Sequence, residues 1–376
     1  MARVVAILQP AIKWLPVLVV GLLVAVPTHA QFAAKNLVSD DQTVNPASIP
    51  DGHLLNGWGI SSSGTSPFWV SANGSGLAVL YNVNPASDAT TKAGLEVTIP
   101  GDGTVTGQAF SNVAGNFNGD TFLFVSEDGT VSGWRGALGT NAETLQTALP
   151  TNSYKGATVY NNGGNVYLYA ANFAAGTVDV LKGNAGAPNL SGSFTDPNLP
   201  SGYAPFNVQN LAGTIYVTYA LRDAMTGDDV AGAGHGFVDA FDTNGNLLQR
   251  IATQGALNSP WGLAIAPASF GSIAGDLLVG NFGDGTINAF NLGTLANDGP
   301  LMTAGNVPLA IDGLWGLVVG NNGSAGSSSR VYFSAGPGDE SHGLFGVVQP
   351  VPEPRTWWLI ASGFAAAGIY RRRFSA

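Results

Sequence analysis

Short apolar segments alternate with clusters of turn-forming residues along most of this chain. Phe68–Asn73 is followed by a turn and by Gly76–Tyr81, and Asp276–Asn281 and Gly285–Phe290 repeat the same order. Apolar runs of about four to eight residues, bounded by Gly, Asn and Asp, are typical of β-strands joined by tight turns. The pattern therefore predicts an all-β protein.

The strand pattern recurs as six units. Five units open with a segment that carries Gly or Trp, one opens at Phe206, and the opening anchors lie at positions 58, 107, 156, 206, 261 and 315. A period of about 50 residues with three or four short strands is typical of a β-propeller, because one small sheet cannot bury both faces while a ring of sheets can. We predict a six-bladed β-propeller over residues 31–350.

Two details of this ring follow from the unit pattern. The glycine near each anchor would let the innermost strands crowd around the axis. We expect Trp58, Trp261 and Trp315 to pack in the wedges between blades, with ligand contact as the alternative. The strand-like stretch Ala33–Ser39 precedes the first unit, and we expect it to add the outer strand of the last blade and so remove an open edge.

Composition supports this fold class. The chain has 52 Gly among 376 residues, which disfavours long helices, and 45% hydrophobic residues, which disfavours disorder. It has no Cys, which excludes disulfides, thiolate metal sites and a Cys nucleophile. The Pro-rich stretch Pro188–Pro205 is predicted to be a loop rather than a domain linker.

Charge is distributed unevenly between the ends and the middle. The formal net charge is −10, but six of the 14 basic residues lie in the two terminal segments. Residues 31–350 hold 8 basic and 23 acidic residues. Such a surface repels phosphate backbones, so we predict no nucleic-acid partner.

The N-terminal 30 residues have the pattern of a secretory signal helix. Arg3 and Lys13 precede the apolar stretch Trp14–Val26, and small residues lead to a cleavage site between Ala30 and Gln31. Export through the Sec machinery is the prediction, and a permanent N-terminal anchor is the alternative.

The last segment, residues 351–376, combines three features in order. A Pro352-Glu353-Pro354 motif precedes the apolar run Trp357–Tyr370, and three arginines follow: Arg371, Arg372 and Arg373. The run predicts a transmembrane helix before processing, with the arginines on the cytoplasmic side.

This ordered set resembles the PEP-CTERM sorting signal of Gram-negative bacteria. The resemblance implies export across the inner membrane, recognition and removal of the tail by an exosortase, and delivery to the cell surface, often in exopolysaccharide producers. A plain C-terminal membrane anchor is the alternative.

The repeat also resembles NHL-type and gluconolactonase-type propellers. Ser259-Pro-Trp-Gly-Leu263 and Gly285-Thr-Ile-Asn-Ala-Phe290 carry this likeness best. The whole chain is similar to an uncharacterised family of secreted PEP-CTERM propeller proteins, for which no activity is implied.

Loops that lead into inner strands and turns after second strands should share one face, around the channel mouth. The candidate rim residues there are Asn56, Asn207, Asn258, Asp312, Asn73, Asn172 and Asn281. Their oxygens suit Ca²⁺, and gluconolactonase-like enzymes bind a divalent ion on the axis. Here Asn dominates, and Asp312 is the one acidic candidate ligand among the residues that lead into the inner strands. The alternative is that these side chains cap turns by bonding to their own backbone.

No catalytic residue is assigned, because His53, His235 and His342 are isolated and no nucleophile elbow or phosphate loop occurs. We expect a non-catalytic surface or matrix protein that binds an exopolysaccharide or a surface protein. Phe173 and Phe282 are candidates to stack on sugars, and packing in the core is the alternative for both rings. The alternative is a divalent-metal-dependent hydrolase or lactonase. Its candidate ion ligands are Asp312, Asn258, Asn207 and Asn56.

Overall fold

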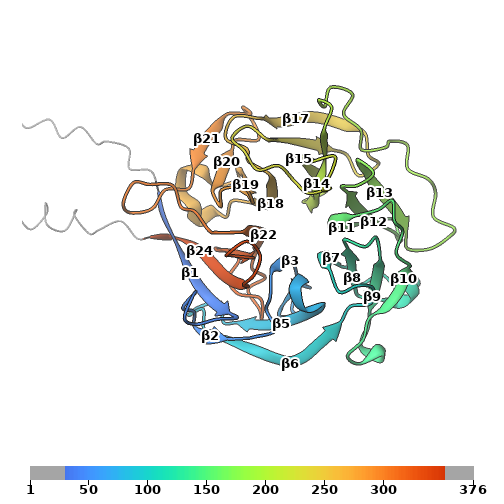
Figure 1. Cartoon of the computed structure of the whole chain (residues 1–376), viewed down its shortest axis with the longest axis horizontal. Helices are drawn as coiled ribbons and strands as arrows, with labels where there is room; N and C mark the ends of the chain where they lie inside the picture. Colours follow the sequence, from blue (N-terminus) through green and yellow to red (C-terminus); the bar gives the residue numbers. More distant parts are fainter. Residues whose placement is uncertain (1–29, 352–376) are drawn as a thin grey trace, which may run out of the picture.

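The computed structural model describes residues 30–351, and these form six β-sheets arranged in a ring (Figure 1). The prediction of a six-bladed β-propeller is confirmed. The PEP motif, the arginine cluster and both predicted terminal helices lie outside the described residues. Within residues 30–351, no helix is long and apolar enough to cross a membrane.

The blades follow one another along the chain, and in each the first strand lies nearest the axis (Figure 1). Blade 1 contains β3 (Gly57–Ser61), β4 (Phe68–Ala72), β5 (Leu77–Val83) and β6 (Thr90–Thr98). Blade 2 contains β7 (Val105–Phe110), β8 (Phe122–Ser126), β9 (Val131–Trp134) and β10 (Glu143–Gln146). Blade 3 has three strands, which are β11 (Tyr154–Asn162), β12 (Asn165–Asn172) and β13 (Thr177–Lys182).

The second half of the ring continues this order. Blade 4 contains β14 (Tyr203–Leu211), β15 (Thr214–Leu221), β16 (Gly236–Phe241) and β17 (Leu247–Thr253). Blade 5 contains β18 (Pro260–Ile265), β19 (Leu277–Asn281), β20 (Ile287–Phe290) and β21 (Asn297–Pro300). Blade 6 contains β22 (Leu314–Val319), β23 (Val331–Ala335) and β24 (Leu344–Val351), extended by β1 (Gln31–Ser39) and β2 (Ile49–Pro50). Four short 3-10 helices lie in connections: η1 (Asn73–Ser75), η2 (Phe117–Gly119), η3 (Gly136–Leu138) and η4 (Ala268–Ile273).

The ring closes through the first described strand. β1 pairs with β24 in antiparallel fashion, with Gln31 opposite Val351 and Ser39 opposite Leu344. The strand predicted at Ala33–Ser39 therefore adds to the last blade, as expected. Both strands of this pair lie inside residues 31–351. The pairing covers the edge of β24 that would otherwise be open.

Apolar side chains from neighbouring blades fill the wedges between sheets. Between blades 6 and 1, for example, Phe68 contacts Tyr332 and Phe345, with ring centroids 4.6 and 5.3 Å apart. The three Trp-Gly tryptophans do not belong to these wedges. Trp58, Trp261 and Trp315 instead form one cluster with Phe206 and Phe173 at the axis. The expected place of these tryptophans was therefore wrong, because each lies at a local distortion of its strand.

That distortion is a shift of register that recurs in all six innermost strands. In β18, Pro260 pairs with Asn281 and Gly262 with Gly280, so Trp261 is the extra residue. Equivalent shifts occur in β3, β7, β11, β14 and β22. A β-bulge bends its strand and redirects one side chain. The six residues at the bulges are Trp58, Thr106, Lys155, Phe206, Trp261 and Trp315.

Candidate binding site at the axial mouth

Five of the six bulge residues are followed by glycine, and the structure shows why. A Cβ on Gly107 would lie 2.4 Å from the backbone nitrogen of Ala157, and one on Gly262 would lie 2.7 Å from the carbonyl oxygen of Trp315. Neighbouring inner strands therefore approach too closely for a side chain at these points. This explains the glycine at the start of most units.

Blade 4 departs from this rule because Asn207 follows its bulge residue. The Asn207 side chain is buried, and its Nδ2 donates a hydrogen bond to the carbonyl oxygen of Trp261 at 2.7 Å. Its Oδ1 accepts from the backbone nitrogen of Val208 at 2.8 Å. Asn207 thus joins blade 4 to blade 5 below the mouth, and its polar atoms are bonded within the protein.

Aromatic rings close the axis at the level of the bulges. Trp315 is stacked between Phe282 and Trp58, with centroid distances of 3.9 and 3.7 Å. Trp261 meets both tryptophans edge-on, at 5.8 Å from Trp315 and 6.3 Å from Trp58. We call Trp58, Trp261, Trp315, Phe206 and Phe282 the aromatic plug.

The three indole N–H groups of the plug have different environments. Trp315 Nε1 donates to Asn56 Oδ1 at 3.1 Å, and Trp261 Nε1 donates to the carbonyl oxygen of Lys155 at 3.1 Å. Trp58 Nε1 is buried and has no partner among the described residues. A buried donor without an acceptor is costly, so a ligand or a water at Trp58 would remove an energetic penalty.

Lys155 brings a positive charge to the plug. The residue is 7% exposed, and its Nζ lies 5.3 Å from the centre of the Trp58 ring, a cation–π geometry. The ammonium group also bonds to Glu127 Oε1, which comes from the turn after β8. Glu127 Oε2 in turn accepts from Asn73 Nδ2 at 3.2 Å. Blades 1 and 2 therefore fix the lysine of blade 3.

Two further carboxylates lie near this lysine. Glu340 belongs to an exposed turn, but its Oε1 folds back to accept from Asn56 Nδ2 at 3.1 Å. Burial raises the pKa of Glu340, the hydrogen bond from Asn56 opposes this, and the charge of Glu127 adds to it. Burial also raises the pKa of Asp229, against the charge of Lys155. The mouth thus combines three carboxylates, one ammonium group and an aromatic floor.

The predicted rim residues divide into two groups, of which the first lies at the mouth. Asn56 and Asn73 bond to each other and to the carboxylates described above. Asn258 Nδ2 donates to Asp284 Oδ2 at 3.2 Å, while its Oδ1 accepts from the backbone nitrogen of Gly232 at 2.6 Å. Asp312 is exposed and accepts from the backbone nitrogen of Gly338 at 2.9 Å.

The second group serves the backbone and the turns. Asn172 Oδ1 accepts from the backbone nitrogens of Ser153 and Ala175, both at 3.1 Å. Asn281 Oδ1 accepts from the backbone nitrogen of Asn258 at 3.1 Å, and its Nδ2 donates to the carbonyl oxygen of Ala256 at 2.8 Å. These two side chains and Asn207 are buried. Asn172 caps its own turn through Ala175, as the turn-capping alternative predicts, whereas Asn207 and Asn281 also bond to the backbone of other segments.

The four side chains considered for an axial ion are each directed to a different protein group. Asn56 Oδ1 accepts from Trp315, Asn207 Oδ1 from Val208, Asn258 Oδ1 from Gly232, and Asp312 Oδ2 from Gly338. Indole rings also occupy the axis between the inner strands. This donor arrangement does not fit an ion that needs about six to eight oxygens around one point.

In residues 30–351, one trio of acidic and His side chains is close enough for metal binding. It consists of Asp51, His53 and Glu96, at the outer side of blade 1. Lys92 Nζ lies 2.6 Å from Asp51 Oδ1 and 2.5 Å from Glu96 Oε1. The ammonium group of Lys92 therefore already supplies the cation at this place.

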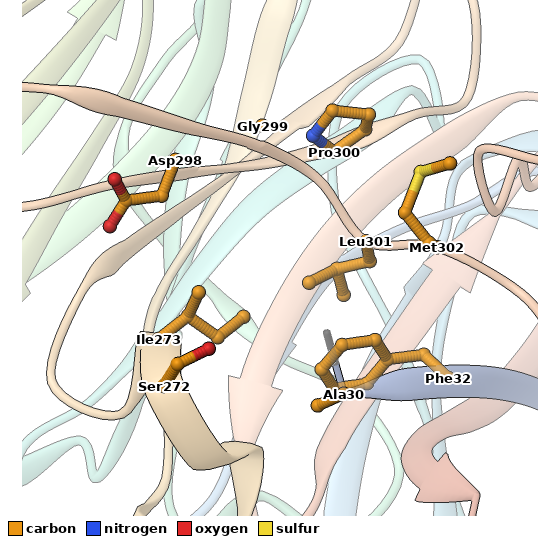
Figure 2. Close-up of a pocket in the computed structure, with 9 residues that line it drawn as sticks. All are labelled: Ala30, Phe32, Ser272, Ile273, Asp298, Gly299, Pro300, Leu301 and Met302. Carbon is orange, nitrogen blue, oxygen red and sulfur yellow. The ribbon is translucent and has the colours of Figure 1, made fainter. Parts of the chain in front are cut away.

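Cavities elsewhere in residues 30–351 differ in size and lining. Below the plug, a cavity of about 10 Å³ is lined by Gln108, Asn207 and Gln209 among others, which is room for about one water. A second hollow of about 130 Å³ lies beside the start of β1 (Figure 2). Figure 2 shows Phe32, Ile273 and Leu301 around this space, with Ala30 at its border. Two larger hollows, of about 440 and 400 Å³, lie beside β17 and beside the end of β24, and the first is lined by Arg250 and Phe290 among others.

Sequence reasoning did not find Lys155, Glu340 or Asp229. Lys155 had a signal, because aligning the units on their opening glycine places Lys155, which precedes Gly156, where three other units have Trp. Glu340 and Asp229 come from long connections whose place over the axis no repeat fixes. Phe173 follows the core-packing alternative, because it is fully buried against Phe206 at a centroid distance of 5.0 Å, whereas Phe282 is half-buried.

Comparison with known proteins gives relatives of unknown function. No family model matches the chain. Two uncharacterised proteins of Acanthamoeba polyphaga mimivirus are 29% and 28% identical to it. The first match covers 81% of this chain and 77% of the relative, and the second covers 84% and 85%. These relatives are viral, and the bacterial sorting resemblance stays a prediction.

Solved structures show only distant likeness. An aldose sugar dehydrogenase from Streptomyces coelicolor is 12% identical, with a TM-score of 0.45 over 85% of this chain and 99% of that chain. The periplasmic gluconolactonase of Pseudomonas aeruginosa is 16% identical, with a TM-score of 0.42 over 78% of this chain and 85% of that chain. Similarity at this level carries no conclusion about activity.

Proposed function

We propose that this chain is a non-catalytic binding protein of the cell surface, which binds an exopolysaccharide through the axial mouth. The observation that carries the proposal is the aromatic plug, whose rings occupy the axis at the level of the bulges, with carboxylates and amides at the mouth beside it. A surface that combines polar and aromatic groups suits recognition of a ligand that has both hydroxyl groups and apolar faces.

The chemistry of the mouth favours a hydroxyl-rich ligand. Carboxylate and amide groups of Glu127, Glu340 and Asn73 can exchange hydrogen bonds with sugar hydroxyls. Phe282 is half-buried, with one ring face stacked on Trp315, so its remaining surface is available to the apolar face of a sugar. The unpartnered N–H of Trp58 would gain an acceptor if a sugar oxygen reached it.

The terminal segments supply the cellular part of the proposal. The predicted signal peptide would direct export, and the segment 351–376 would direct sorting by an exosortase. In the structure Gln31 already pairs with Val351, and Phe32 donates a backbone hydrogen bond to Met302 at 2.7 Å. Cleavage between Ala30 and Gln31 would therefore take place before the ring closes.

The binding test compares two aromatic or apolar truncations in the ring formed by residues 30–351. Phe282→Ala changes the mouth, and Leu248→Ala changes an exposed residue of β17 on the outer side of blade 4. Affinity electrophoresis against exopolysaccharide from an exosortase-containing bacterium should show a mobility shift for the wild type and Leu248→Ala, weakened in Phe282→Ala. Equal mobility of all three in the presence and absence of polysaccharide contradicts the proposal.

The sorting test uses the full chain expressed in a Gram-negative bacterium with an exosortase. Replacing Pro352, Glu353 and Pro354 by Ala should keep the protein in the membrane fraction, while the wild type is released as a shorter form. The mass of the released protein gives both cleavage sites. Release of the triple variant at the wild-type mass contradicts the sorting proposal and leaves the binding proposal to its own test.

A further inference from the structure

Blade 3 lacks the outer strand that the other blades have. Its sheet ends at β13, whereas blades 1, 2, 4 and 5 have a fourth strand and blade 6 is extended by β1 and β2 (Figure 1). In the described part of the chain, no backbone hydrogen bond joins residues 177–182 to any strand except β12. One edge of β13 therefore presents backbone donors and acceptors without backbone partners.

The chain that could have formed the missing strand is used elsewhere. After β13, the connection 183–202 runs to blade 4, where Gly192 donates to the carbonyl oxygen of Asn244 and Phe194 to that of Gly245, both at 2.9 Å. The Phe194 ring lies 5.5 Å from Phe241 and 4.8 Å from Tyr169. The connection seals the wedge between blades 3 and 4 and leaves the edge of β13 unpaired.

Blade 3 is also the neutral blade of an acidic ring. From the start of β11 to the residue before β14, two lysines, Lys155 and Lys182, balance two aspartates, Asp179 and Asp196. Within residues 30–351, divided at the first residue of each inner strand and with residues 30–56 counted in blade 6, each of the other five blades carries a net charge of −2 to −4. Two copies of this protein repel each other through any other blade and meet least repulsion at blade 3.

We infer that the edge of β13 pairs with the same edge of a second copy. Antiparallel pairing of the two β13 strands about a two-fold axis would join two three-stranded sheets into one sheet and use each edge once, which closes the assembly as a dimer. This inference is independent of the function proposed for the mouth.

The sequence of β13 favours one register. Pairing centred on Val180, which is 36% exposed, sets Val180 against its own copy and Asp179 against Leu181. Pairing centred on Asp179 would set two carboxylates against each other, which is destabilising. We therefore place Val180 at the two-fold axis.

The absence of Cys from the chain allows a direct test of this register. In the ring 30–351, Val180→Cys would bring two thiols together at the dimer axis, while Leu248→Cys places a thiol on the exposed outer strand of blade 4 as the matched control. Under mild oxidation, Val180→Cys should form a disulfide-linked dimer at low micromolar concentration at least about tenfold faster than Leu248→Cys. Equal rates for the two variants overturn the inference.

Sedimentation of the wild-type ring gives a second, independent measurement. The wild type should form dimers, more strongly at about 300 mM than at about 20 mM NaCl, because salt screens the repulsion between the acidic blades. Val180→Lys should sediment as a monomer, because it sets two like charges at the axis, while Leu248→Lys keeps the wild-type behaviour. A monomeric wild type at every salt and protein concentration overturns the inference, as does a Val180→Lys dimer.

Discussion

The six bulges around the axis divide into an aromatic side and a polar side. Blades 4, 5, 6 and 1 contribute Phe206, Trp261, Trp315 and Trp58, whereas blades 2 and 3 contribute Thr106 and Lys155. A β-bulge in the innermost strand occurs on both sides. On the aromatic side, the bulges bury rings against each other. On the polar side, they place the hydroxyl group of Thr106 between blades 2 and 3 and the ammonium group of Lys155 over the ring of Trp58.

The difference teaches how a repeated fold acquires an individual site. The aromatic side holds the ring together by packing, which any large apolar residue partly supplies. The polar side makes specific contacts, because Lys155 bonds to Glu127 and covers Trp58. Substitutions of single residues on each side separate these two roles.

Trp315→Ala should have the largest effect. Trp315 is 1% exposed and contacts Phe282, Trp58 and Trp261, so its removal leaves a cavity at the centre of the plug. We expect the free energy of unfolding, measured by urea denaturation, to fall by about 3–5 kcal/mol. Trp134→Ala, on the half-buried outer part of blade 2, should cost less. A loss no larger than that of the control would show that the plug does not stabilise the ring.

Thr106→Val should have an intermediate effect although it preserves shape. Thr106 Oγ1 lies 3.1 Å from the carbonyl oxygen of Val125 and 2.7 Å from that of Tyr154, which links blade 2 to blade 3. Loss of the donor should cost about 1–3 kcal/mol, measured as for Trp315→Ala. Thr91→Val, at an exposed site on β6, should change stability by less than about 0.5 kcal/mol. A neutral Thr106→Val would mean that these carbonyls have other partners.

Lys155→Met should have a smaller effect, because Glu127 is partly exposed and water can replace the ammonium group. Loss of the ion pair and of the contact with Trp58 should lower the free energy of unfolding by about 1 kcal/mol at low salt, and by less at high salt. Lys182→Met on β13 is the control for removing a positive charge from blade 3. Equal losses in the two variants would show that only the net charge of the blade matters.

Glu340→Gln should have the smallest effect, and its sign depends on pH. Burial raises the pKa of Glu340 above its usual value of 4.5, so the ionised side chain weakens the folded state. The Glu340 carboxyl group therefore does not lower the free energy of unfolding below about pH 4.5, and lowers it as pH rises through the folded-state pKa. The variant should match the wild type near pH 4 and exceed it at neutral pH in thermal denaturation. A variant less stable than the wild type at neutral pH would contradict this sign.

Much of the ring could be predicted from the chain alone because its causes are local. Turn residues and short apolar runs mark strands wherever they occur, and their period of about 50 residues sets the number of blades. All six opening anchors lie in the innermost strands. The Pro188–Pro205 stretch is a loop up to residue 202, and β14 begins at Tyr203. Pro205 lies in this strand because proline is tolerated near the start of a strand.

The candidate site could be predicted only in part. Asn56 and Asn73 lie at the mouth as expected, but Asn172, Asn207 and Asn281 have the same residue type and bond inside the protein. The sequence does not show whether a side chain will form hydrogen bonds with a neighbouring segment of backbone. Phe173 and Phe282 show the same limit, because both follow second strands and only Phe282 remains accessible.

The sequence by itself determined the class of fold, the number of repeats, the acidic surface and the lack of cysteine chemistry, because these depend on local pattern and composition. The tertiary structure decided that the tryptophans meet on the axis, that Lys155 joins them, and that blade 3 ends one strand early. Each of these depends on contacts between residues far apart in the chain. The bulges, the long connections over the mouth and the crossing of residues 183–202 to blade 4 bring those residues together only when the ring is closed.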